Sequence, residues 1–154
     1  MTNRPKRIGT AAESAVVRAA RAHGFGAAER RALHGSADLG DVLLCPGVIL
    51  EVKGGAAAHH PSDAQLEAWL AETETERRNA GAHIGLLVTQ RAGVGAPNAA
   101  RWWAWQRYSD FAWAVGRARR DLRDVPVRLP LWAALTLLRI RGWGDPIEEE
   151  NGDE

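Results

Sequence analysis

Residues 40–54 constrain the fold most, because they have the pattern of two short apolar strands joined by a tight turn. The dipeptide Pro46-Gly47 is a turn signal, and both of its flanks are rich in Val, Leu and Ile. Three charged residues interrupt this predicted hairpin: Asp41, Glu51 and Lys53. Charged groups at the end of an otherwise buried strand cost free energy unless something uses them.

A divalent cation would use these charges. Side chains alternate between the two faces of a strand, so Glu51 and Lys53 share one face, whereas Leu50 and Val52 point to the other, into the predicted core. Asp41 and Glu51 would repel each other as neighbours in a sheet, and a hard cation between them turns that repulsion into affinity. Mg²⁺ fits, because it binds few protein carboxylates, keeps several waters and accepts phosphate oxygens. Lys53 would lie beside those waters, able to orient a nucleophile or to stabilise negative charge.

The register of the hairpin decides whether the two carboxylates meet. A loop with an odd number of residues places Asp41 opposite Glu51, on the same face. Residues 45–48 favour instead a two-residue loop, which places Asp41 opposite Val52 unless a β-bulge or the twist of the sheet brings it back. The alternative to a metal site is an ordinary core hairpin with a salt bridge at its edge.

A helix and a strand are expected before the hairpin. The helix is predicted over residues 10–23, with Thr10 and Glu13 forming a capping box at its start. A strand is predicted within residues 27–33, followed by a loop at the mouth of the proposed site. Asp38 in that loop is a rival to Asp41 as a metal ligand, but its position favours a turn residue.

A strand-helix-strand unit follows from the next part of the sequence. The helix is predicted over residues 62–79, with Ser62 and Gln65 as a second capping box. Its inward stripe is predicted to be Leu66, Trp69, Leu70 and Thr73, and its outer face to be Glu67, Glu72, Glu74, Glu76, Arg77 and Arg78. Residues 83–90 contain a continuous apolar run that is typical of a strand buried on both faces. A crossover of this kind makes its two strands parallel.

The C-terminal third is less regular. Residues 101–108 predict a strand with aromatic side chains on both faces, which favours a core or a subunit interface over the stacking of unpaired bases. A short helix follows, then an extended Pro-bounded segment at 125–130 and an apolar helix at 131–140, which would cap the fold or pack on a second subunit. The expected division is a basic arm at 1–9, a main domain at 10–119, a helical extension at 120–145 and an acidic disordered tail at 146–154.

Composition limits the class of protein. The chain has 154 residues, 45% of them apolar, which suits one globular domain, and its single cysteine excludes an internal disulfide framework. No apolar run reaches transmembrane length, and the first six residues lack the apolar stretch of a signal peptide, so no membrane partner and a cytoplasmic location are expected. The net charge of +1 combines a basic first part with an acidic end. Candidate phosphate contacts are Lys6, Arg7, Arg30, Arg31 and Ser36.

The arrangement Asp41…Glu51-Val52-Lys53 resembles the motif of the PD-(D/E)XK nuclease superfamily, with Gly40 in place of the usual Pro. Within it, the chain is most similar to archaeal-type Holliday junction resolvases and to related nucleases of phages and actinobacterial prophages. The likeness covers roughly residues 6–115 and rests on Glu13, on residues 40–42 and on residues 47–53. It implies a restriction-endonuclease-like α/β core, with a central mixed β-sheet flanked by helices.

The resemblance also implies an activity and a set of site residues. It implies Mg²⁺-dependent cleavage of DNA, with Mn²⁺ as a substitute, by a homodimer that cuts branched DNA such as a four-way junction. The metal ligands would be Asp41, Glu51, the Val52 carbonyl and Glu13, with Lys53 as the catalytic lysine and Gln65 assisting. Two alternatives stay open: a repair or restriction-like nuclease acting on ends, flaps or duplex DNA, and a non-catalytic DNA-binding protein that reuses the fold.

Overall fold

The computed structural model describes residues 4–31, 37–114 and 124–148. These residues form a six-stranded sheet in which the strands follow one another in the order of the sequence. The strands are β1 (Glu29–Arg30), β2 (Val42–Cys45), β3 (Val48–Lys53), β4 (Ile84–Thr89), β5 (Trp103–Arg107) and β6 (Pro126–Pro130). Strands β3 and β4 are parallel, and every other neighbouring pair is antiparallel.

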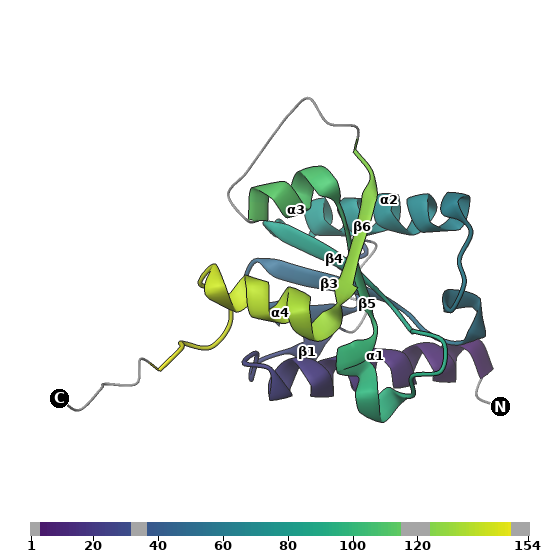
Figure 1. Ribbon diagram of the computed structural model, residues 1–154, viewed down its shortest axis with the longest axis horizontal. Helices are drawn as coiled ribbons and strands as arrows, with labels where there is room; N and C mark the ends of the chain where they lie inside the picture. Colours follow the sequence, from purple (N-terminus) through teal and green to yellow (C-terminus); the bar gives the residue numbers. More distant parts are fainter. Residues whose placement is uncertain (1–3, 32–36, 115–123, 149–154) are drawn as a thin grey trace.

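Helices cover both faces of this sheet (Figure 1). They are α1 (Arg4–Ala22), α2 (Asp63–Asn79), α3 (Tyr108–Ala114) and α4 (Leu131–Ile140), with short 3-10 helices η1 (Ala56–Ala58) and η2 (Ala96–Arg101). In Figure 1, α2 lies above the sheet and α1 and α4 lie below it. The predicted α/β class, a central mixed sheet flanked by helices, is therefore confirmed.

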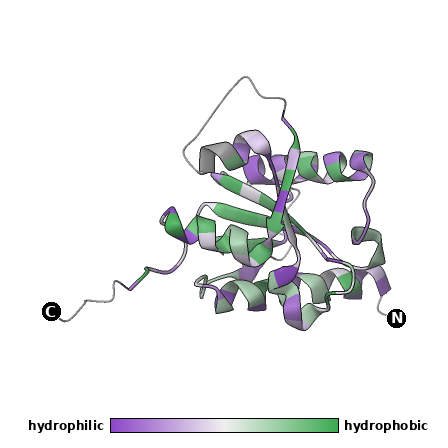
Figure 2. Cartoon of the chain, in the orientation of Figure 1, coloured by the Kyte–Doolittle hydropathy of each residue, from purple (hydrophilic) through white to green (hydrophobic). Residues whose placement is uncertain are grey.

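The two faces of the sheet differ in how much apolar surface they bury. The larger core joins α1 and α4 to side chains such as Leu50, Val52 and Leu86, and the smaller one joins α2 to Leu87. Strands β3 and β4 run through the middle of the molecule and are its most continuously hydrophobic segments (Figure 2). Glu51 faces the smaller core, because it alternates with Leu50 and pairs with Leu87.

The first helix begins earlier than predicted. It starts at Arg4 rather than Thr10, so Thr10 and Glu13 lie inside the helix and do not form a capping box at its start. Pro5 is compatible with this start, because proline is tolerated in the first turn, where its missing N–H has no intrahelical partner to lose. Residues 4–9 of the expected basic arm are thus helical.

The strand-helix-strand unit has the predicted form. Helix α2 is capped by Ser62, whose side chain accepts a hydrogen bond from the backbone N–H of Gln65 at 3.1 Å. Strands β3 and β4 on either side of it pair in parallel over their whole length. The prediction of α2 is wrong in one respect, because Glu76 is 2% exposed and does not belong to the outer face.

The C-terminal part completes the sheet instead of forming a separate helical extension. Strand β6 pairs with β5, although prolines bound it at both ends, because it is an edge strand with one side left unpaired. Helix α4 has its predicted bounds and packs into the same core as α1, through Leu131, Leu135 and Leu138. In the described parts of the chain, no helix is both long enough and apolar enough to span a membrane.

Candidate metal centre

A β-bulge next to the turn sets the register of the hairpin. Cys45 pairs with Val48 across a two-residue turn, as the sequence predicts, but Leu43 pairs with Ile49. Leu44 is therefore an extra residue in β2, and the strand gains one position relative to its partner. The bulge is one of the two ways in which a two-residue turn could still bring the carboxylates together.

Continuing this register places Asp41 opposite Glu51, at the end of the hairpin. The backbone supports that placement, because the Asp41 N–H donates to the Leu50 carbonyl at 3.0 Å. The Asp41 side chain accepts a hydrogen bond from the Val52 N–H at 2.8 Å, which fixes the direction of its carboxyl group. Asp41 and Glu51 thus share one face, as the metal hypothesis requires.

Both carboxyl groups resist ionisation. Burial, the neighbouring Glu51 charge and, to a smaller degree, Glu13 raise the pKa of Asp41 to about 8. Burial and the neighbouring carboxyl group of Glu76 raise the pKa of Glu51 to about 8, although Lys53 acts in the opposite direction. Carboxyl groups in this state gain most from a cation that replaces their protons.

Lys53 is paired with two carboxylates. Its Nζ lies 2.7 Å from Glu51 Oε1 and 3.2 Å from both carboxylate oxygens of Glu72. Burial alone would lower the pKa of Lys53, but these two carboxylates outweigh it and raise the pKa. The Lys53 side chain is 22% exposed, so it is only partly buried.

Two residues of the cluster, Glu72 and Glu76, were not predicted as site residues. Each extends from α2 toward Glu51, and one oxygen from each of the three carboxylates can be chosen so that all lie within 4.8 Å of one another. Burial raises the pKa of Glu76 to about 7. Among the described residues, neither Glu76 oxygen nor Oε2 of Glu51 has a hydrogen-bond partner. Unpartnered buried carboxylate oxygens are the donor set that a hard divalent cation prefers, so the residues present fit such an ion.

The sequence did carry a signal for Glu76. The inward stripe Leu66, Leu70 and Thr73 repeats at three- and four-residue spacing, and Glu76 is its next member. A charged residue at a core position of a helix is a reason to look for its partner.

The remaining candidates from the sequence, Glu13, Gln65 and Asp38, do not belong to the group of Glu51, Glu72 and Glu76. Glu13 is bound to Arg30, whose Nε and Nη2 both lie 2.9 Å from Glu13 Oε2. Gln65 is exposed at the start of α2, roughly 10 Å along the helix from Glu72. Asp38 accepts the Gly40 N–H at 3.0 Å, which confirms the turn role.

The predicted phosphate contacts form two groups. Lys6 and Arg7 are exposed on the first turns of α1. Arg30 is paired with Glu13, and Arg31 donates from Nη1 to the Leu39 carbonyl at 3.0 Å. Ser36 lies outside the described residues.

A groove of about 380 Å³ begins at Lys53 and passes between the start of α1 and the segment after β3. Its lining includes Ile8, the backbone of Gly54 and the ring of Trp69, whose centroid is 5.9 Å from Lys53 Nζ. Because Pro5 and Ile8 line the groove, the exposed side chains of residues 6 and 7 start from its border.

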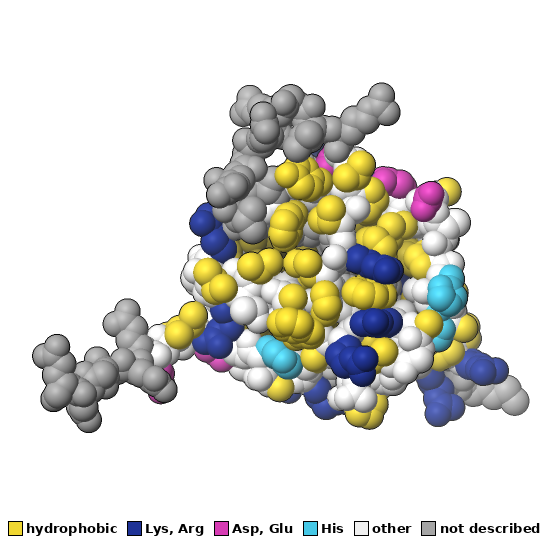
Figure 3. All heavy atoms as spheres, viewed as in Figure 1, with side chains coloured by type: hydrophobic (Ala, Val, Ile, Leu, Met, Phe, Trp, Pro, Cys, Tyr) yellow, Lys and Arg dark blue, Asp and Glu magenta, His cyan; other side chains and the backbone are white. Residues whose placement is uncertain are grey.

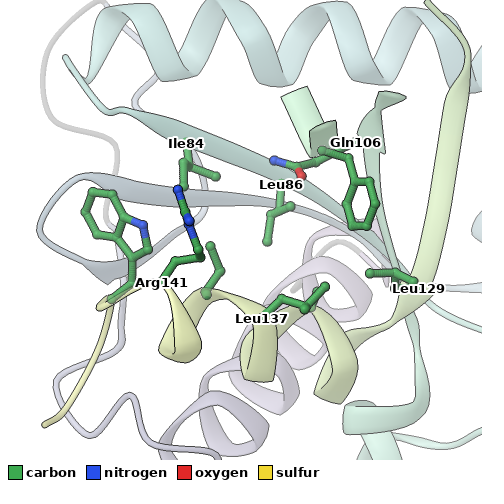
Figure 4. Close-up of a pocket in the computed structure, with 10 residues that line it drawn as sticks. Ile84, Leu86, Gln106, Leu129, Leu137 and Arg141 are labelled. Atoms are coloured by element: carbon green, nitrogen blue, oxygen red, sulfur yellow. The ribbon is translucent and has the colours of Figure 1, made fainter. Parts of the chain in front are cut away.

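A second hollow lies on the opposite face of the sheet and is separate from the carboxylates. It has a volume of about 200 Å³ and lies between α4 and the ends of β4, β5 and β6 (Figure 4). Ile84, Leu86 and Leu137 give it an apolar lining, with Gln106 and Arg141 at its edge. Hydrophobic side chains are also prominent on the outer surface of this face, where Trp132 of α4 is 48% exposed (Figure 3).

Comparison with known proteins adds no assignment: no protein-family model, no curated protein and no solved structure matches this chain. The candidate site is therefore defined by its own geometry, in which carboxyl groups from a hairpin and a helix surround one lysine.

Proposed function

We propose that this protein is a Mg²⁺-dependent DNA endonuclease of the PD-(D/E)XK type, with a restriction-endonuclease-like core. The observation that carries the proposal is the meeting of Asp41, Glu51 and Lys53 at the end of one bulged hairpin. A hairpin with only structural duties gains nothing from two buried carboxyl groups whose pKa values are both raised, that of Asp41 in part by Glu51 itself.

In this proposal Asp41, Glu51 and the Val52 carbonyl would hold a metal ion, which when bound would supply positive charge next to the attacked phosphate and lower the pKa of a water nucleophile. The Val52 N–H orients the Asp41 carboxyl group before any ion arrives. Lys53 remains charged beside Glu51 and donates N–H to the attacked phosphate or to the nucleophilic water. Glu13 and Gln65 have assisting roles that rest on the family resemblance alone.

DNA is the proposed substrate, because a cation site for phosphate chemistry opens onto a groove bordered by basic residues. Lys6 and Arg7 would contact the phosphate backbone along this groove, together with Arg30, Arg31 and Ser36. Branched DNA and a homodimer are proposed on the family resemblance, since a two-fold axis would place two sites on opposing strands.

Cleavage of labelled DNA by the full chain in Mg²⁺ tests the proposal. Wild type is expected to cut, and Glu51→Gln and Lys53→Met are expected to lose at least about a hundredfold in rate, because each removes charge from the reacting centre. Glu74→Gln is the matched control, since Glu74 lies on α2 but pairs with Arg77 and Arg78 outside the cluster. Wild-type rates in both site variants would end the assignment.

A panel of DNA structures tests the substrate. A four-way junction is expected to be cut faster than linear duplex of the same sequence. Equal rates would favour a repair or restriction-like nuclease, and binding without cleavage in either Mg²⁺ or Mn²⁺ would favour a non-catalytic DNA-binding protein.

A further inference from the structure

Glu76 is the least explained charged residue in the described part of the molecule. It is 2% exposed, and both of its carboxylate oxygens are buried without a hydrogen-bond partner among the described residues. The carboxylate opposite it, Glu51, is 4% exposed and also has one unpartnered oxygen, Oε2. Leaving buried polar oxygens without a partner is unfavourable, and more so for a charged group.

The nearby cations are committed elsewhere. Lys53 contacts the other oxygen of Glu51, Oε1, and the carboxylate of Glu72. Arg77 and Arg78 follow Glu76 directly in the sequence, but both turn back to Glu74, at 2.7 and 2.9 Å. None of the three basic side chains, Lys53, Arg77 and Arg78, therefore pairs with Glu76.

The charges of the cluster also exceed what one ion would balance. Asp41, Glu72 and Glu76 lie around Glu51, and of these four carboxylates Lys53 pairs with Glu51 and Glu72. One divalent cation would leave them net negative, which opposes the approach of a phosphate. A second divalent cation would remove that excess.

We propose that Glu76 and Glu72 of α2, together with Glu51, form a second divalent-cation site that shares Glu51 with the site at Asp41. The oxygens that would bind the ion are the unpartnered oxygens of Glu51 and Glu76, with Glu72 closing the site from its exposed side. The proposal rests on the proposed function to the extent that Glu51 is shared. Its new element is the ligand set supplied by the helix, which lies outside the Asp-Glu-x-Lys motif.

Titration of the full-length, metal-free protein with Mn²⁺ counts the sites, with free Mn²⁺ followed by electron paramagnetic resonance. Wild type is expected to bind two ions and Glu76→Gln to bind one, with the remaining ion lost in the double variant Asp41→Asn/Glu76→Gln. Glu72→Gln should keep both sites but raise the dissociation constant of one by about tenfold, the lower end of the range for losing a supporting ligand group. Glu74→Gln, from the same helix, should match wild type.

The outcomes separate this proposal from the nuclease assignment. One ion in wild type that persists in Glu76→Gln and is lost in Asp41→Asn overturns the second site and leaves the nuclease proposal intact. One ion that persists in Asp41→Asn and is lost in Glu76→Gln supports the helix site and contradicts the role of Asp41. No bound ion overturns both. If Glu76→Gln does not fold, the exposed residue Glu72 decides, and an unchanged affinity in Glu72→Gln overturns the proposal.

Discussion

Three carboxyl groups at the centre of this molecule are held where ionisation is unfavourable. Burial is the largest cause in each case, and it raises the pKa of Asp41 and of Glu51 to about 8 and that of Glu76 to about 7. Each group therefore holds its proton more tightly in the folded state than in the unfolded chain, where it would ionise near pH 4. The residues most useful for binding a cation are also the residues that weaken the fold when no cation is present.

The stability of the metal-free protein should consequently fall as the pH rises. Between about pH 4 and pH 8 the folded state binds more protons than the unfolded state, so the free energy of unfolding decreases with pH in that window. Thermal melts in EDTA at pH 5.5, 7.0 and 8.5 should show a falling melting temperature, by about 3 °C for each kcal/mol lost at this chain length. Mn²⁺ should restore stability most at pH 8.5, where fewer protons compete with it.

The matched variant for this experiment is Glu51→Gln, which keeps the size of the side chain and removes one of the titrating groups. Its melting temperature in EDTA should depend less on pH than that of wild type. A wild-type profile that stays level or rises between pH 5.5 and 8.5 would contradict the proton affinities given to the cluster.

Glu13 offers a second test at the scale of a single residue. Its ion pair with Arg30 is partly exposed, 17% for Glu13 and 42% for Arg30, so Glu13→Gln should change the free energy of unfolding by less than about 1 kcal/mol. The negative charge of Glu13 nevertheless raises the pKa of Asp41, so it acts on a residue proposed to bind the metal. If Glu13 assists the metal, the cleavage rate should fall by at least about tenfold, as for other groups that support a ligand. An unchanged rate would leave Glu13 with its ion pair alone.

At the scale of elements, the β-bulge decides whether the site exists. Inserting one alanine between Asp41 and Val42 would leave the bulge in place and move Asp41 one position along, opposite Val52, on the other face of the hairpin. The insertion is expected to abolish Mn²⁺ binding at the Asp41 site, as measured by the same titration.

The control for this insertion is Leu44→Ala, which destabilises the same strand but keeps its number of residues and therefore the position of Asp41. It should cost about 2–5 kcal/mol of stability, because Leu44 is fully buried, and it should still bind Mn²⁺. Equal ion binding by the two variants would show that register is not what brings the carboxylates together.

The close approach of α1 to the end of β3 depends on a glycine. A Cβ on Gly54 would clash with Cβ of Ala12, so Gly54→Ala must push the helix away from the sheet. The expected cost is about 1–3 kcal/mol, the usual range for overpacking. Gly95→Ala is the control, since its Cβ would meet only Pro97 at an ordinary 3.7 Å.

A compensating change gives this prediction a sharper form. Ala12→Gly removes the atom that the new methyl group would strike, at a cost of about 1 kcal/mol for glycine inside a helix. In a double-mutant cycle measured by urea unfolding, the pair Gly54→Ala/Ala12→Gly should be more stable than the sum of the single variants predicts. Strict additivity would mean that the two positions do not press on each other.

These elements also show which features the sequence reveals and which it hides. Helices α2 and α4 follow from stripes at three- and four-residue spacing, and the turn follows from Pro46-Gly47. The bulge stays hidden because Val42 to Cys45 are all apolar, so alternation cannot reveal an extra residue. The role of Glu76 is missed for the opposite reason, since a carboxylate in an apolar stripe resembles the start of a solvent face until the partner from β3 is in view.

At the scale of the whole molecule, the boundary predicted near residue 120 does not match the packing. Strand β6 extends the sheet beyond β5, and the Leu131 N–H at the start of α4 donates to the Trp102 carbonyl at 2.7 Å. The buried side chains of α4 belong to the same core as those of α1 and β3. Elements that share one core are expected to unfold together.

A variant that ends after Asp124 should therefore fail to fold, although it keeps every residue of the proposed catalytic set. It loses β6, which leaves one side of β5 unpaired, and it loses the buried leucines of α4, which leaves part of the core exposed. Burying a leucine contributes about 1.5–3 kcal/mol, so losing three of them consumes most of the 5–15 kcal/mol that stabilises a typical domain. A variant that ends after Pro146 retains α4 and is the control. Cooperative melting of the shorter chain by circular dichroism would show that residues 1–124 are sufficient to form a folded sheet without β6 and α4.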